Sequence, residues 1–411
     1  MISRKALANL ATATLLAFAL SAFSLEGQQA LPLERLLEQV ESNPELGVEL
    51  ERTKSRQARL DIVESGKLPS LHFSGDSDLL NSNDEQRFVT ATMEQTIIDW
   101  GALSSDLESA SESLEAQRYA ILATKTELRR SVVDSYLAAI VSEQQLAATQ
   151  TAITTTSDIR RVMQRRVDQR VDAASDLLLI DSRINELQAR MFQLDGAKRD
   201  AQLNLLQTVG YRADVHEALN CTGGLDEAFL AELAVEQSAD LSATKARSRS
   251  IKAEFGAVDA KRLPAIVAGL SLSRDIDDAD DEARVFLRVR YYYDLGDILD
   301  SELAELKADY SASVFEERRL AQNVVRVTAG LVNQYQINAL QLPLLESLVE
   351  LRQQQLDSIS RRFSSGRSSL MDLLNAESEL LEARLVHVDA FGSACQAILT
   401  LEQLVGIKLR D

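Results

Sequence analysis

The chain has 411 residues, of which only 5 are prolines, 16 are glycines and 5% are aromatic. This composition favours long helices over compact globular domains, because proline and glycine interrupt helices and aromatic residues fill compact cores. The net charge of −19 at pH 7 argues against nucleic acid as a partner, since phosphate binding needs a basic surface.

The first 24 residues are typical of a secretory signal peptide. Arg4 and Lys5 precede an apolar run over residues 6–23, and the small residues Ala22 and Ser24 suit a cleavage site. An uncleaved membrane anchor is the alternative. No cysteine follows the run, so we expect no lipid attachment there. No later stretch holds about 20 consecutive apolar residues, the length that a transmembrane helix needs.

Leucines at helical spacing predict a helix from about residue 31 to residue 66, in which Asn43-Pro44 opens a second helical segment. Leu68-Pro69 then ends the helical character. Two alternating segments around a polar turn predict a β-hairpin over 70–98. From 102 to about 160 the chain lacks both proline and glycine, and apolar residues recur seven apart, as in a coiled coil, at Leu107, Leu114, Ile121 and Leu128.

The second half of the chain repeats the order of the first. Asp176-Leu177-Leu178 recurs 196 residues later as Asp372-Leu373-Leu374, and Leu68-Pro69 recurs 195 residues later as Leu263-Pro264. Each half therefore reads as helix, hairpin, long helix, turn and helix, a mainly α fold with a small β part. The predicted boundaries are 25–215 for the first repeat (hairpin 70–98, long helices 101–210) and 216–411 for the second (hairpin 265–293, long helices 296–406).

The last predicted strand alternates arginines with apolar residues. Arg284, Arg288 and Arg290 fall on one face, with Phe286 as the exception, and the other face carries Val285, Leu287, Val289, Tyr291 and Tyr293. This pattern suits a membrane strand with water on one side and lipid on the other. A sheet packed on a soluble core is the alternative. Because four strands cannot close a barrel, a membrane role predicts that several chains pool their strands.

The order of these features resembles the TolC-type outer-membrane efflux proteins. The resemblance is carried by Gly366, by the run Asp372 to Ala376, by its weaker copy at Asp176, by Asn43-Pro44, and by the Leu-Pro and Asp-x-Gly pairs around each hairpin. It implies a trimer with a twelve-stranded outer-membrane β-barrel, four strands from each chain, joined to a long periplasmic α-helical barrel. It also implies the exit duct of a tripartite efflux or type I secretion system, with a periplasmic adaptor and an inner-membrane pump as partners.

The resemblance also implies roles for individual residues. Asp176 and Asp372 fall at the pore constriction, and Gly366, Arg367 and Arg170 fall at the turns where an adaptor docks. Arg170 stands where a glycine is usual, and Asn375 stands where a second acid is usual. The residues alone leave helix N-capping open as another role for the two aspartates.

Three aromatic residues at the hairpin ends, Trp100, Tyr291 and Tyr293, are candidates for a girdle at the membrane interface. Alternatively, these residues are ordinary aromatic residues of strands and do not form a girdle.

No pattern of catalysis or cofactor binding stands out. The three histidines, His72, His216 and His387, lie far apart, and no metal-binding motif is present, so we expect neither an enzyme nor a cofactor. Cys221 and Cys395 could pair in an oxidising compartment, but we expect two unpaired, buried thiols. A periplasmic coiled-coil adaptor or structural protein without a pore is the alternative function.

Overall fold

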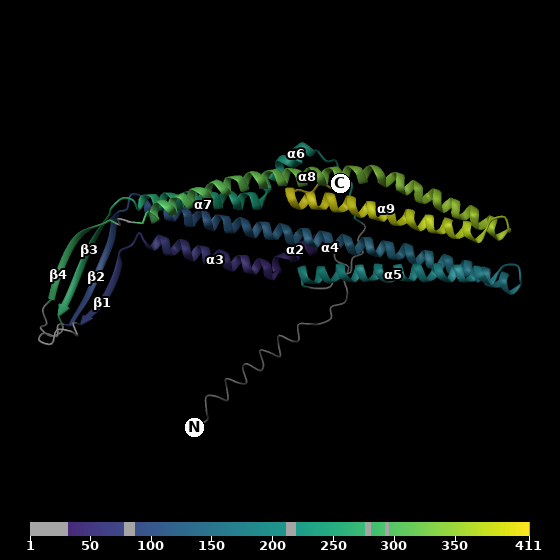
Figure 1. The fold of residues 1–411 in the computed structure, drawn as a ribbon, viewed down its shortest axis with the longest axis horizontal. Coiled ribbons are helices and arrows are strands. Elements are labelled where there is room, and N and C mark those ends of the chain that lie inside the picture. Colours follow the sequence, from purple (N-terminus) through teal and green to yellow (C-terminus); the bar gives the residue numbers. More distant parts are fainter. Residues whose placement is uncertain (1–31, 78–86, 211–218, 276–280, 292–295, 411) are drawn as a thin grey trace, which may run out of the picture. The chain divides into compact units, whose positions relative to one another are not determined.

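The computed structural model describes residues 32–77, 87–210, 219–275, 281–291 and 296–410 (Figure 1). The expected signal peptide, His216 and Tyr293 lie outside the described residues. Over these ranges the protein is mainly helical and has one four-stranded sheet. None of the helices within them is both long and apolar enough to cross a membrane.

The elements of the first half are α2 (Leu33–Gln39), the 3-10 helix η1 (Val40–Ser42), α3 (Pro44–Ser65), β1 (Ser70–Ser77), β2 (Arg87–Ile98), α4 (Ala102–Asp168) and α5 (Ala174–Val209). Those of the second half are α6 (Glu227–Gln237), α7 (Ala239–Ala260), β3 (Ala265–Asp275), β4 (Asp281–Arg290), α8 (Ile298–Ser364) and α9 (Leu370–Val405).

The predicted internal duplication is confirmed by the matched helix lengths. Helices α4 and α8 have 67 residues each, α5 and α9 have 36, and α3 and α7 have 22. Matched residues also start α3 and α7. The Asn43 side chain accepts a hydrogen bond from the Glu45 N–H (2.8 Å), and the Ser238 hydroxyl accepts one from the Leu241 N–H (3.3 Å). Such N-caps satisfy backbone donors that have no partner inside the helix.

The chain forms two compact units, each with its own core. One unit comprises residues 1–38, 134–219 and 352–388, and so holds both helix-turn-helix ends. Its core includes Ala152, Leu187, Leu381 and Leu385. The other unit comprises 39–133, 220–351 and 389–411 and holds the sheet. Its helical core includes Leu230, Ala234, Val332, Leu401 and Val405.

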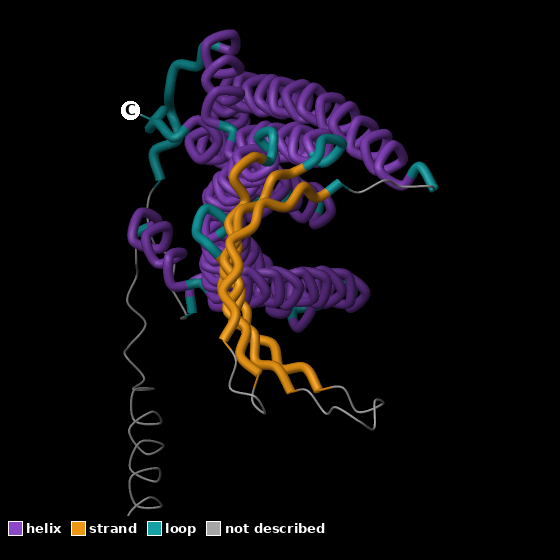
Figure 2. The backbone as a smooth tube through the Cα atoms, turned by 90° about the vertical axis from the view of Figure 1, so that its left-hand side faces the viewer, coloured by secondary structure: helices purple, strands orange, loops and turns teal. Residues whose placement is uncertain are grey.

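The two hairpins join into one antiparallel sheet with the order β1-β2-β3-β4, and Figure 2 shows the four strands side by side. Its register aligns residues of one kind across all four strands. One row is apolar: Leu71, Met93, Leu270 and Val285. The neighbouring row is polar: His72, Thr92, Ser271 and Arg284. Because neighbouring residues of a strand point to opposite faces, the sheet has one apolar and one polar face.

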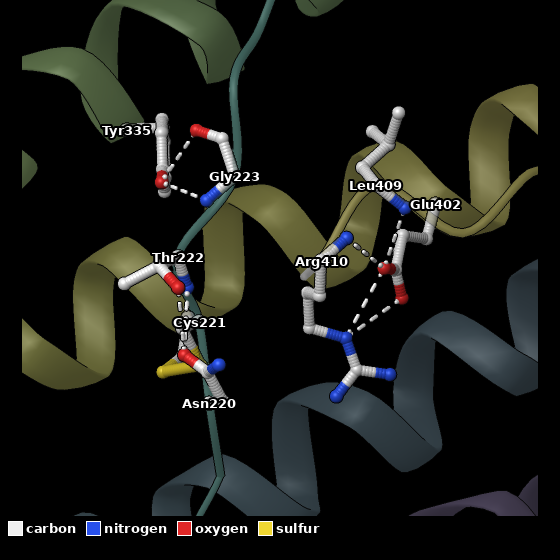
Figure 3. Close-up of polar contacts among 9 residues, drawn as sticks. Asn220, Cys221, Thr222, Gly223, Tyr335, Glu402, Leu409 and Arg410 are labelled. Carbon is white, nitrogen blue, oxygen red and sulfur yellow. Dashed lines mark hydrogen bonds and ion pairs between the residues drawn. A yellow bond between two sulfur atoms is a disulfide. The ribbon is translucent and has the colours of Figure 1, made fainter.

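The segment between the two repeats is fastened by a disulfide between Cys221 and Cys395, which lie 174 residues apart (Figure 3). The expectation of two unpaired thiols was therefore wrong. Both cysteines are buried, as expected, but the fold brings the connecting segment against α9, a proximity that their spacing in the sequence does not reveal.

Hydrogen bonds extend this attachment to α8 and to the C-terminal residues (Figure 3). The Gly223 N–H donates to the Tyr335 hydroxyl (2.8 Å), which donates in turn to the Gly223 carbonyl (3.0 Å). A Cβ atom on Gly223 would lie 2.3 Å from the Leu409 carbonyl oxygen, so only glycine is accommodated there. The buried Glu402 carboxylate accepts from the backbone N–H groups of Leu409 (2.9 Å) and Arg410 (3.1 Å).

We expect Cys395→Ser to lower the free energy of unfolding by about 4 kcal/mol, because the bond closes a long loop in the unfolded chain. Thermal unfolding of the purified protein with and without a reductant measures the loss. Cys221→Ser is the matched control. The two single variants and the double variant should be equally destabilised, since each removes the same bond. Additive losses would show that the thiols stabilise the fold separately.

Candidate functional site

The two turns between the long helices have the same backbone geometry. In the first, the Val171 N–H donates to the Arg166 carbonyl (2.8 Å) and the Arg170 N–H donates to the Val167 carbonyl (2.8 Å). Bonds from Arg367 to Arg362 and from Gly366 to Phe363 repeat the pattern in the second turn. This pair of bonds is the Schellman motif, which ends a helix with one residue in the left-handed region.

Arg170 and Gly366 are the left-handed residues of these turns, with φ angles of 60° and 73°. A residue with a Cβ pays roughly 1–2 kcal/mol for this conformation, whereas glycine adopts it freely. The departure at Arg170 from the usual glycine therefore leaves the turn geometry unchanged but strains the backbone. Arg367, the next residue of the second turn, holds its side chain against the Ser365 hydroxyl through Nε (3.0 Å).

Asp372 belongs to a capping box at the start of α9. Its carboxylate accepts from the Ser369 N–H (3.0 Å), while its own N–H donates to the Ser369 hydroxyl (3.1 Å). The Ser368 hydroxyl also donates to the carboxylate (3.0 Å). These hydrogen bonds hold the pKa of Asp372 below its usual range. The Ser369 backbone N–H has the largest effect, and the hydroxyls of Ser369 and Ser368 have smaller ones. The side chain is exposed and keeps its negative charge at neutral pH.

Asp176 occupies the matching position of α5 without a capping box. The residue before that helix is Ala173, which offers no side-chain cap. Neither aspartate is therefore the N-cap residue itself. Only Asp372 takes part in capping, from inside the first turn.

The first turn is held by another interaction, an ion pair between Arg166 and Asp172 (2.5 Å). The Arg166 guanidinium also lies over the Phe363 ring, 5.2 Å from its centre, and this contact joins the two turns.

Glu377 of α9, which follows Asp372 in the sequence, is a site residue that the sequence did not predict. Its side chain is buried, with 3% of the residue exposed. Burial raises the pKa of the Glu377 carboxyl to about 7, against the opposing effects of Arg183 on α5 and Arg384 on α9. Glu377, Glu379 and Glu382 all follow Asp372 closely, so the sequence alone does not single out the buried acid.

The sheet has the two faces that the sequence of its last strand predicts. On the apolar face, Val285, Leu287 and Val289 are 86%, 78% and 66% exposed. On the polar face, Glu94 of β2 pairs with Arg288 (2.9 Å) and Arg290 (3.4 Å). No pattern in the sequence identifies Glu94 as the partner of these arginines.

Phe286 is the one aromatic residue on the polar face of β4, and local packing accounts for it. It lies opposite Gly269, whose missing side chain leaves room for the ring, and the Arg288 guanidinium covers that ring at 4.8 Å.

Two of the three girdle candidates lie in the described residues. Trp100 is 54% exposed and its indole N–H donates to the Pro264 carbonyl (2.9 Å), so it links the end of β2 to the start of β3. Tyr291 directly follows β4 and is 56% exposed. Tyr293 lies outside the described residues. The fold therefore places Trp100 and Tyr291 in the unit with the sheet, and all five turn and constriction candidates in the other unit.

A duplicated set of long helix pairs attached to a two-faced sheet defines the TolC-like class of channel proteins. Comparison with known proteins confirms this class: the family described as outer membrane efflux protein matches residues 36–211 and 230–407, one match for each repeat. The chain belongs to this family, and its place is the outer membrane. It is 21% identical over 413 residues to the pyoverdine export outer membrane protein OpmQ of Pseudomonas putida, covering 91% of this chain and 85% of OpmQ.

Two further proteins resemble the chain over most of its length. It is 22% identical over 367 residues to nodulation protein T of Rhizobium leguminosarum bv. trifolii, covering 83% of this chain and 78% of that protein. Among solved structures, the outer-membrane channel OprN superposes with a TM-score of 0.82 at 19% identity, covering 91% of this chain and 89% of OprN. The shared fold thus extends over nearly the whole described chain.

We expect Arg170→Gly to raise the free energy of unfolding by about 1 kcal/mol, because glycine removes the left-handed strain at the first turn. Gly366→Ala, the opposite change at the matched position, should lower it by a similar amount. Thermal unfolding of both variants measures these two changes in the free energy of unfolding. A destabilised Arg170→Gly protein would mean that contacts of the arginine side chain outweigh the strain.

Glu377→Gln should remove a pH dependence of stability. Because the pKa of Glu377 rises from 4.5 in the unfolded chain to about 7 in the fold, its ionisation opposes folding. The free energy of unfolding of the parent protein should fall between pH 4.5 and 7. The variant should lack this loss, which amounts to about 3 kcal/mol between pH 4.5 and pH 8. Glu382→Gln removes an exposed carboxylate from the same helix and serves as the control. Parallel pH profiles of parent and Glu377→Gln would contradict the assignment.

Proposed function

We propose that the chain is one subunit of a homotrimeric exit duct, through which an efflux or type I secretion system passes its substrate from the periplasm to the exterior. The observation that carries the proposal is the two-faced sheet, whose outer strands each have one partner within the described residues. A periplasmic adaptor or structural protein without a pore, the alternative, would leave the exposed apolar face of this sheet in water.

The sheet edges support an oligomer. Within the described residues, β1 and β4 each pair with a strand on one side only. Hydrocarbon offers no hydrogen-bond partner to the backbone groups of an open edge, so strands in a bilayer must close into a barrel. Four strands fall short of the roughly eight that a barrel needs. Three copies would supply twelve strands, with the apolar face toward lipid and the face of Arg288 and Glu94 toward water.

The helix turns support a periplasmic entrance. The exposed Asp372 carboxylate stays ionised, and three copies of Asp176 and Asp372 would make a ring of six carboxylates. Crowded carboxylates attract cations and disfavour anions, so we assign both residues to the pore constriction. We assign Gly366, Arg367 and Arg170 to the surface where a periplasmic adaptor docks, and Trp100, Tyr291 and Tyr293 to the membrane interface.

The proposed organisation of the chain follows the predicted boundaries: a signal peptide over 1–24 that is removed on export, and two structural repeats over 25–215 and 216–411. Transport through such a duct is passive and needs neither catalysis nor a cofactor in this chain, so an inner-membrane pump would supply the energy. The name of OpmQ refers to pyoverdine export. Since a pump selects what enters the duct, we propose no single substrate for this protein.

We expect Asp176→Asn combined with Asp372→Asn to lower the cation-over-anion permeability ratio by about two- to fivefold in planar bilayers, because the ring loses its charge. Glu232→Gln on α6 removes one exposed charge elsewhere and should leave the ratio unchanged. The native mass of each protein, extracted from the outer membrane, should be that of a trimer. A monomeric mass would refute the duct, whereas an unchanged ratio in a trimer would remove the two aspartates from the constriction.

A further inference from the structure

The polar face of the sheet is positively charged in the half that adjoins the helices. Arg284, Arg288 and Arg290 of β4 share this face, and the register places them beside Ser271, Val267 and Ala265 of β3. Glu94 is the one acid among the described strand positions of this half. Three arginines against one glutamate leave two net positive charges in each chain. Farther along the same face, Asp275 and Glu282 reverse the sign.

The charges that flank the strands at Arg290 do not cancel this excess. A pocket beside Arg290 is lined in part by Lys261, Asp99 and Glu302. The Asp99 carboxylate accepts hydrogen bonds from the backbone N–H groups of Gly101 (3.0 Å) and Leu103 (2.9 Å), so it serves the start of α4. Lys261 and Glu302 offset each other in charge. The positive charge of the polar face therefore remains on the strands.

Glu94 orients two of the arginines without using up their donors. Arg288 donates to one carboxylate oxygen (2.9 Å) and Arg290 to the other (3.4 Å). The Glu94 side chain is 18% exposed, whereas those of Arg288 and Arg290 are 52% and 42% exposed. A guanidinium has five N–H donors, and each of these gives one to Glu94. The two cations thus lie over a half-buried carboxylate and present further donors to water.

Arg288 is also held from its other side. Its guanidinium lies 4.8 Å from the centre of the Phe286 ring, and that ring occupies the space left by Gly269. A side chain fixed in this way loses little conformational freedom when it binds a ligand. The planar fork of a guanidinium matches the paired oxygens of a carboxylate or phosphate.

A face that only has to meet water does not need arginines. On β2 and β3 the same face is polar through hydroxyls, with Thr90 against Ser273 (3.1 Å) and Thr92 against Ser271 (3.4 Å). The arginines are confined to β4, where they place charge on a surface that hydroxyls already make polar.

We propose that Arg284, Arg288 and Arg290 of the three subunits form an anion-binding collar inside the duct, and that the exported substrates carry carboxylate or phosphate groups. The inference rests on the proposed function, in which the polar face lines the lumen. Its sign is opposite to that of Asp176 and Asp372 in the other unit, so the pump would drive these substrates past the aspartates before the collar receives them.

The test measures the electrostatic potential at the collar with charged thiol reagents. Thr96 is exposed and lies in the same row of the sheet as Val267 and Arg288, so Thr96→Cys places a thiol there. The two native cysteines form the disulfide and do not compete. Modification rates are measured with the anionic sulfonatoethyl and the cationic trimethylammonioethyl methanethiosulfonates, on the full-length protein in non-ionic detergent at low salt. The anionic-to-cationic rate ratio, divided by that of mercaptoethanol, should exceed one.

Variants of the collar should move this ratio in opposite directions. Arg288→Gln with Arg290→Gln should lower it by about tenfold at low ionic strength, where charges are little screened. Glu94→Gln should raise it, a gain that misfolding would not produce. Arg274→Gln is the matched control, because Arg274 lies on the opposite face of the sheet and pairs with Asp281 (3.6 Å). It should leave the ratio unchanged.

Citrate and inorganic phosphate test binding itself. At constant ionic strength, millimolar citrate or phosphate should lower the ratio in the parent thiol variant and have little effect after Arg288→Gln with Arg290→Gln. A high ratio that neither anion changes would overturn the binding of oxyanions.

The native mass separates the collar from the duct. A trimer whose ratio is one, or does not respond to the arginine and glutamate variants, would overturn the collar and leave the duct standing. A monomeric native mass would overturn both.

Discussion

Backbone groups at the edge of a sheet need hydrogen-bond partners, and in a lipid bilayer only protein can supply them. The sheet of this protein meets that constraint in its interior, where β2 of the first repeat pairs with β3 of the second. Its outer strands are left with one partner each within the described chain. The exposed apolar face of the sheet agrees with the outer-membrane location, since lipid can cover it.

The internal duplication provides the paired strands in the interior of the sheet from two similar halves. Each half supplies a hairpin, a short helix before it and a long helix after it. The halves are joined both by the pairing of β2 with β3 and by the packing of α4 against α7. The side chains differ where their surroundings differ: Ala246 is buried in α7, whereas Glu51, at the matching position of α3, is exposed.

The described part of the connection between the halves, residues 219–226, is held in place by several bonds. The disulfide, the paired hydrogen bonds of Tyr335 and the buried Glu402 tie the segment around Gly223 to α8, α9 and the C-terminal residues (Figure 3). A loop of this length would otherwise carry a large conformational entropy. These bonds therefore hold the connecting segment against α8 and α9.

Much of this architecture is determined by the sequence alone. Helix spacing, the absence of proline and glycine from the long segments, and the two offsets of 195 and 196 residues predict the duplicated fold, and the alternation in β4 predicts the two faces of the sheet. The spacing and the alternation depend on neighbours a few residues away, and the offsets come from comparing one half of the sequence with the other. The disulfide, the burial of Glu377 and the pairing of Glu94 with Arg288 were decided only by the tertiary structure. Each depends on residues distant in the sequence, whose proximity arises from helix and strand packing that no local pattern records.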